Sequence, residues 1–274
     1  MKKALLSLFL LLIPIYSIAC DCMTTSPILE FLDSEYVFTG DVIKKAYSDD
    51  LKNYTVTILI DKHYKGRVSK PKQLEFTFRS KYNKVSSSCD FYINENDKLL
   101  VYAKLSTNNI LSFGLMCSNS KKLNNSKISV EELNILKSGN SFRLEDYLFT
   151  NELGFDDSLP IANLDLLFSN APKTKYSKTY ATFKMLIDAE GSLIDVYYDY
   201  GFQIKFDPLF KLPISIDKAD AKEVSNFESD AISILRKIKT WEPKTHIKTN
   251  TNVKHIKHIS LTYDEKNSKW NYEF

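Results

Sequence analysis

The chain has 274 residues, of which 43% are hydrophobic, including 17 Phe and 16 Tyr; with only 7 Gly, this composition indicates globular domains and excludes a fibrous or low-complexity protein. The formal net charge is +3, from 37 Lys and Arg against 34 Asp and Glu. Because the basic residues are spread among acidic ones, the pattern indicates a solvated surface and no nucleic-acid partner.

Residues 1–19 have the pattern of a cleavable secretory signal peptide. Two lysines precede an apolar run from Ala4 to Ile15, and the small residues at positions 17 and 19 suit a signal peptidase. The apolar run is shorter than the roughly 20 residues that a membrane-spanning helix needs. We therefore expect export to the periplasm, the cell surface or the extracellular space, with a mature chain that begins at Cys20.

Lipoprotein processing is the alternative fate of this N-terminus. A cysteine directly after Ile18-Ala19 fits part of a lipobox, although Ser17 stands where a lipobox prefers Leu. Lipidation would use the Cys20 thiol and its amine, and would anchor the protein to a membrane. We expect contact with a membrane only in that case.

A short helix and five strands are predicted after the signal peptide. Ser26 suits an N-cap and Pro27 the first position of a helix that ends near residue 34. β-forming or alternating residues then predict strands over Tyr36–Lys44, Tyr54–Ile60, Leu74–Phe78, Leu99–Ala103 and Ile110–Met116. Five strands with cysteines at both ends predict a small closed barrel of the OB type.

The remaining chain predicts a connector and a second domain. A helix over Ser129–Lys137, with a stop signal after it, ends the first domain (20–139), and residues 140–177 have the weak periodicity of a connector with partial structure. Residues 178–274 predict a small α+β domain with strands Tyr180–Ile187, Leu193–Tyr198 and Val253–Thr262 and a helix Phe227–Ile238. The predicted fold class is therefore mainly β plus α+β.

All four cysteines lie in the first domain, at positions 20, 22, 89 and 117. An even number of cysteines in an oxidising compartment predicts two disulfide bonds. The residues alone leave their pairing open.

The first domain resembles the netrin-like module of the tissue inhibitors of metalloproteinases (TIMPs) over about residues 20–137. The likeness lies in Cys20-Asp21-Cys22, the short helix, Tyr36 to Val42, Tyr64-Lys65-Gly66, Cys89-Asp90-Phe91, Leu100 to Ala103 and Cys117, in the family's order. It implies that Cys20 pairs with Cys89 and that Cys22 pairs with Cys117. In the chain-entropy model, each long loop so closed stabilises the fold by about 4 kcal/mol.

The same resemblance implies a partner-binding N-terminus. The backbone amine and carbonyl of Cys20 would chelate the zinc of a partner metalloprotease, and Asp21, Cys22 and Met23 would complete the contact with that partner. The family usually has Thr or Ser at the second mature position, where this chain has Asp21. A carboxylate entering an apolar pocket beside the protease's catalytic Glu disfavours inhibition of ordinary metalloproteases.

The last domain resembles the C-terminal domain of TonB-type proteins over about residues 178–265. The likeness covers Phe183 to Tyr198 around Asp188-Ala189-Glu190-Gly191, a helix from Glu228 to Lys239, and Trp241-Glu242-Pro243 before a strand. No transmembrane anchor or Pro-rich spanning segment accompanies it, so energy transduction is not expected. What it implies is a strand edge that recruits another chain.

No catalytic motif stands out, and we expect neither an enzyme nor a cofactor. The sequence has no GxSxG, P-loop, GxGxxG or CxxC motif and only four histidines. Two functions follow: a cell-envelope protein-binding module acting as a metalloprotease inhibitor, or an envelope scaffold or recruitment protein, lipid-anchored or not, without inhibitory activity.

Overall fold

The computed structural model describes residues 23–66, 70–84, 89–124, 126–198, 200, 202–218 and 224–274. The predicted signal peptide, Cys20, Asp21 and Cys22 lie outside these residues. The fold is mainly β, with 41% strand and 16% helix. The chain divides into two compact units, one ending at Glu132 and the other covering Leu133–Phe274, which we call unit 1 and unit 2.

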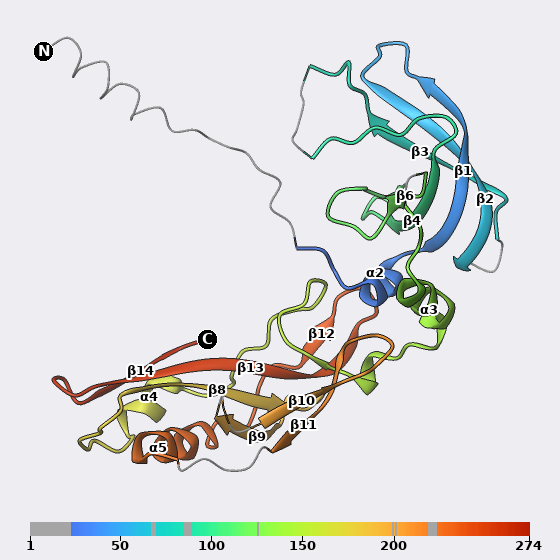
Figure 1. The fold of residues 1–274 in the computed structure, drawn as a ribbon. Helices are drawn as coiled ribbons and strands as arrows, with labels where there is room; N and C mark the ends of the chain where they lie inside the picture. Colours follow the sequence, from blue (N-terminus) through green and yellow to red (C-terminus); the bar gives the residue numbers. More distant parts are fainter. Residues whose placement is uncertain are drawn as a thin grey trace, which may run out of the picture. The chain divides into compact units, whose positions relative to one another are not determined.

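Unit 1 is built on a single antiparallel sheet with the strand order β3-β2-β1-β4-β5, and β6 pairs with β4 (Figure 1). The strands and the two helices of this part of the chain are α2 (Pro27–Asp33), β1 (Tyr36–Tyr47), β2 (Asn53–Lys65), β3 (Gln73–Arg79), β4 (Lys98–Leu105), β5 (Leu111–Ser112), β6 (Lys121–Lys122) and α3 (Val130–Ser138). All five predicted strands are present, although β5 is much shorter than the predicted Ile110–Met116.

The sheet of unit 1 curls because its two longest strands are irregularly paired. The register between β1 and β2 shifts three times, and bulges of this kind bend and twist a strand pair. Gly40 lies at one shift, where an added Cβ would be only 2.5 Å from the carbonyl oxygen of Leu59. A residue with a side chain would therefore push β2 away at this point.

Aromatic rings bring the two edges of the curled sheet together. The ring of Phe113, just after β5, lies edge-on against Phe76 and Phe78 of β3, with centroid distances of 4.8 and 5.2 Å. These rings belong to a buried apolar cluster on one face of the sheet. In the described strands, however, β3 and β5 do not pair. The prediction of a mainly β unit is confirmed, whereas the described sheet is not a closed barrel.

Unit 2 contains a mixed sheet with the order β12-β13-β8-β9, in which β7 and β14 also pair with β13 (Figure 1). Its elements are the 3-10 turns η1 (Gly139–Ser141) and η2 (Leu144–Asp146), β7 (Leu148–Phe149), α4 (Leu164–Ser169), β8 (Tyr180–Ile187), β9 (Leu193–Tyr198), β10 (Phe202–Phe206), β11 (Pro213–Lys218), α5 (Asn226–Leu235), β12 (Lys244–His246), β13 (Thr251–Asp264) and β14 (Lys269–Glu273). β10 and β11 form a separate hairpin.

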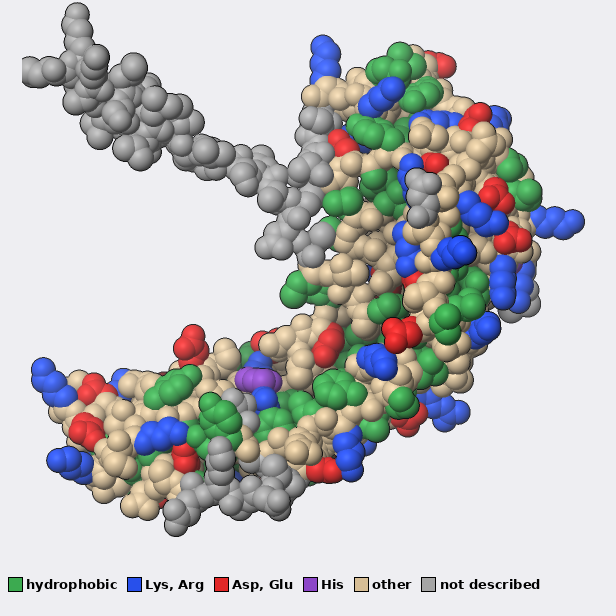
Figure 2. All heavy atoms as spheres, in the orientation of Figure 1, with side chains coloured by type: hydrophobic (Ala, Val, Ile, Leu, Met, Phe, Trp, Pro, Cys, Tyr) green, Lys and Arg blue, Asp and Glu red, His purple; other side chains and the backbone are tan. Residues whose placement is uncertain are grey.

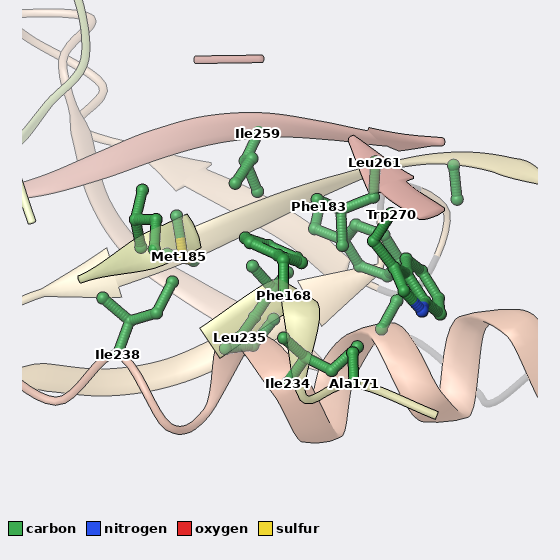
Figure 3. Packing of buried hydrophobic residues seen from close by; sticks show 14 of the residues in the cluster. Phe168, Ala171, Phe183, Met185, Ile234, Leu235, Ile238, Ile259, Leu261 and Trp270 are labelled. Carbon is green, nitrogen blue, oxygen red and sulfur yellow. The ribbon is translucent and has the colours of Figure 1, made fainter. Parts of the chain in front are cut away.

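Helices α4 and α5 pack on the sheet of unit 2 because β8 alternates strictly in burial. Figure 3 shows Phe183 and Met185 of β8 pointing towards Ile234 and Leu235 of α5, with Phe168 of α4 between them. Burying a side chain of this size contributes roughly 1.5–3 kcal/mol. This cluster is the main apolar core of unit 2.

The ends of these elements follow from local chemistry. Ser225 and Glu228 form a capping box at the start of α5. Gly191, in the turn between β8 and β9, has a φ of +85°, and its carbonyl oxygen accepts a hydrogen bond of 2.7 Å from the main-chain N–H of Trp241. Trp241 is 1% exposed and fills the core after the helix.

Two predicted boundaries differ from the structure. The first unit ends within α3, at Glu132, rather than at residue 139. The segment 140–177, predicted as a connector, belongs to unit 2, since β7 pairs in parallel with β13 and α4 contributes Leu164 and Phe168 to the core. Short elements such as these carry too few residues for a periodic pattern.

Candidate functional site at the N-terminal segment

The structure describes only part of the predicted partner-binding segment. Met23 is 68% exposed, and the segment leads through Thr24 and Thr25 into α2. Cys20, Asp21 and Cys22 lie outside the described residues. Cys89 and Cys117 each take part in a disulfide bond, while their pairing with Cys20 and Cys22 stays a prediction.

Glu30 is a buried carboxylate at the centre of this region, only 2% exposed. Its Oε1 accepts a hydrogen bond of 2.7 Å from the Ser118 hydroxyl, and its Oε2 accepts bonds of 2.7 and 2.6 Å from the main-chain and side-chain nitrogens of Asn119. The ammonium of Lys104 lies 3.8 Å from Oε1. A buried charge needs such partners, because an uncompensated carboxylate would cost several kcal/mol.

The Glu30 network joins the N-terminal segment to the loop that carries Cys117. The side-chain nitrogen of Asn119 also donates to the carbonyl oxygen of Thr25, at 2.9 Å. In the same loop, the Ser118 hydroxyl lies 3.1 Å from that of Ser120, which accepts a bond of 2.8 Å from the Tyr102 amide in β4. The residues just after the predicted mature terminus are therefore held by side chains 88 to 94 positions away in sequence.

A second set of contacts fixes the other end of α2. The Lys65 ammonium, at the end of β2, donates to the carbonyl oxygens of Phe31 and Leu32 at 2.8 and 2.6 Å. A cation at a helix C-terminus also suits the helix dipole. With Ile28, Leu29 and Phe31 buried, α2 is a rigid base for the segment that precedes it.

Next to this network lies a hollow of about 210 Å³, lined by residues of α2, β4, β5 and the loop before Ser118, among them Glu30, Lys104, Met116 and Cys117. Met116 is 46% exposed, and Cys117 has a left-handed φ of +57°. A non-glycine residue in this region costs energy that the surroundings must offset. The hydrogen bonds of Ser118 and Asn119 are contacts of this loop that can offset such a cost.

Charged side chains elsewhere do not gather into a site on the face drawn in Figure 2, where lysines and arginines are interspersed with acidic residues. Within the described residues, no group of three or more His, Cys, Asp or Glu side chains could hold a metal ion. His255 and His258 in β13, three residues apart, differ in burial: His255 is 1% exposed and His258 is exposed.

No protein-family model matches the chain, and no curated protein sequence matches it. None of the helices in the described part of the chain is long and apolar enough to cross a membrane.

The sequence pointed to Cys20 and its neighbours but not to the residues that hold them. Glu30 does not stand out in the sequence because it lies within the apolar stripe of a short helix, between Leu29 and Phe31. An acidic residue in that stripe was itself a usable signal, since a buried carboxylate requires partners. Nothing local in the sequence could have identified Ser118 and Asn119 as those partners.

Proposed function

We propose that this chain is an exported protein-binding module of the cell envelope, and that the segment from Cys20 to Met23 is its partner-binding surface. The observation that carries the proposal is the Glu30 network, which ties Thr25, two residues after Met23, to the loop that carries Cys117. Ordered residues next to a binding segment lower the conformational entropy that is lost on association.

The specific mechanism that we propose is inhibition of a zinc metalloprotease. Catalytic zinc sites keep one coordination position for water or substrate. The α-amino group of Cys20 and the carbonyl oxygen of the same residue would occupy it as a five-membered chelate on the partner's zinc. An α-amino group has a reference pKa of about 8, so its proton is readily lost beside a metal ion.

Asp21 would then determine which proteases are bound. Its carboxylate would enter the partner's specificity pocket, where an apolar lining and the catalytic Glu both oppose it. The proposed partner is therefore a metalloprotease with a polar or basic specificity pocket. An Asp21→Thr variant should shift inhibition towards proteases with apolar pockets.

A netrin-like OB fold for unit 1 remains part of the proposal. It is supported by the curled sheet, by the contact of β3 with the end of β5 through Phe76, Phe78 and Phe113, and by the disulfide-bonded state of Cys89 and Cys117. For unit 2, a TonB-C-like fold is supported by the sheet order β13-β8-β9 with α5 packed on it.

The deciding experiment compares two forms of the protein that differ by one residue. The first begins at Cys20, and the control has one alanine added before Cys20, which moves the amine away from the Cys20 carbonyl. Each form, and the Asp21→Thr variant of the first, is assayed against a panel of zinc metalloproteases. Inhibition by the Cys20 form that is lost in the extended form supports the mechanism; no inhibition by any form rejects it.

The alternative function is an envelope scaffold or recruitment protein without inhibitory activity, lipid-anchored at Cys20 or free. The observation that favours it is β9, which is the terminal strand of its sheet and exposes Ile194 to 52%. A photo-crosslinking residue at Ile194 would capture a partner in the envelope. The intact mass of the protein, measured before and after reduction, distinguishes a lipidated Cys20 from a free one. An added lipid mass excludes the zinc chelate.

A further inference from the structure

Unit 2 contains a buried lysine that the proposed function does not use. Lys244, the first residue of β12, is only 4% exposed. Its ammonium donates one hydrogen bond, of 3.1 Å, to the main-chain oxygen of Asp156, and lies 5.8 Å from the centre of the Phe155 ring. Among the described residues, no carboxylate oxygen lies within 4.0 Å of it.

An ammonium in this setting has few direct hydrogen-bond partners. It carries three N–H donors, of which one has a hydrogen-bond acceptor among the described residues. Burial lowers the pKa of Lys244, and the neighbouring Lys257 also disfavours its charge, whereas nearby acidic groups oppose the shift. Buried charges of this kind are normally paired, so the unfilled donors indicate a position for an acceptor.

Lys244 lines a pocket of about 370 Å³. Its lining also includes Asn151, Lys257 and Phe274, besides acidic side chains. Lys257 and Asp157 neutralise each other through a contact of 2.6 Å. Of the two lysines in this lining, Lys244 is therefore the one that has no carboxylate in contact among the described residues.

The acidic lining limits the charge of a ligand. Glu152 is held by Thr150, which donates from its main-chain N–H and its hydroxyl at 2.5 and 3.1 Å, and Asp156 and Asp157 lie in the same lining. Because three carboxylates surround the pocket, a dianion such as phosphate would meet more repulsion than a monoanion. The aromatic rings of Phe155 and Phe274 offer an apolar surface to the rest of the ligand.

We propose that this pocket binds a single carboxylate group carried on an apolar or aromatic body, with the Lys244 ammonium as its principal donor. The carboxylate accepts the N–H groups that the protein leaves unfilled, and the Asn151 amide is a second available donor. Such a group is supplied either by a free small acid or by the C-terminus of a peptide.

The test uses amide NMR spectra of the full mature chain titrated with benzoate, acetate and inorganic phosphate. Benzoate should cause saturable shifts at residues around the pocket, with weaker binding of acetate and the weakest of phosphate. In Lys244→Met, benzoate binding should weaken by at least about tenfold. The matched control is Lys254→Met, which removes an exposed lysine of β13 and should leave binding unchanged.

Two arms distinguish the sources of the carboxylate. A short peptide ending in Phe is compared with its amidated form and with N-acetyl-phenylalanine. Preference for the free peptide over the small acid identifies a peptide terminus, and the reverse identifies a small acid. Equal binding of the amidated peptide, equal benzoate binding by the folded Lys244→Met variant, or no saturable shift with any carboxylate overturns the proposal.

Discussion

Replacing the buried Glu30 by Gln tests the network behind the N-terminal segment. In its best orientation, the Gln oxygen accepts from both nitrogens of Asn119, and its amide nitrogen donates to the Ser118 hydroxyl, which can reverse its role. All three contacts survive as neutral hydrogen bonds, in place of charge-assisted bonds of 2.6 to 2.7 Å. Losing about 1 kcal/mol from each predicts a destabilisation of about 3 kcal/mol.

Glu30→Ala should cost more, about 5 kcal/mol, because it leaves the donors of Ser118 and Asn119 without an acceptor and opens a cavity. Glu131→Gln, at an exposed position of α3, is the matched control and should change stability by less than about 0.5 kcal/mol. Urea unfolding followed by hydrogen exchange in β4 measures the free energy of unfolding for unit 1.

The two tryptophans provide an internal control for this experiment. Trp241 and Trp270 are the only tryptophans of the chain, and both belong to unit 2. Their fluorescence should report the same unfolding transition in wild type and variant, while hydrogen exchange in unit 1 accelerates. A Glu30→Gln variant whose β4 amides are as protected as those of the wild type would refute the reasoning.

Three further predictions concern unit 2. Gly191→Ala should destabilise it by about 3 kcal/mol or more in urea unfolding, because φ is +85° and the new Cβ would lie 2.1 Å from the Trp241 carbonyl oxygen; an unchanged midpoint would contradict this. Burial lowers the pKa of His255 to about 4, from a usual 6.5. Since the unfolded chain binds the proton at a higher pH than the folded chain, the free energy of unfolding should fall by about 3 kcal/mol as the pH drops from 6.5 to 4. His255→Gln should remove this part of the pH dependence. An equal pH dependence of stability in wild type and variant would show that His255 is not its source. Although burial opposes it, hydrogen bonds from Lys178 and the Ser225 amide hold the pKa of Glu228 at about 2. The ionised Glu228 therefore stabilises unit 2 above pH 4.5, and this stabilisation is lost towards pH 2. In unfolding measured as a function of pH, Glu228→Gln should lower stability by about 2 kcal/mol at neutral pH, a value reduced because Lys178 is partly exposed, and should have no effect near pH 2.

The parts of the fold that follow from sequence are those with a sustained pattern. The predicted bounds of β8 and β9 agree with the structure, and α2 begins at Pro27 as expected from its capping residues. The hairpin of β10 and β11 and the strands β12 and β14 were not predicted. They are short, and their pairing depends on partners that only the folded chain supplies.

The candidate sites show the same difference between features that are local in sequence and features that depend on tertiary structure. Cys20 can be found from the sequence because a signal peptide and a cysteine pattern are local features. The partners of Glu30 and Lys244 cannot be found in this way, since they lie 88 or 89 residues away in sequence. A charged residue within an apolar stretch can be noticed, but whether it is compensated is decided by tertiary structure.

The measurement that tests the central claim most directly is coordination of a partner's metal by the amine of Cys20. A metalloprotease with cobalt in place of zinc has a visible absorption spectrum that reports the ligands of the metal. The chain that begins at Cys20 should change this spectrum at stoichiometric binding, and the form with an added alanine should not. No change with the Cys20 form on a protease that it inhibits, or the same change with both forms, would contradict the account.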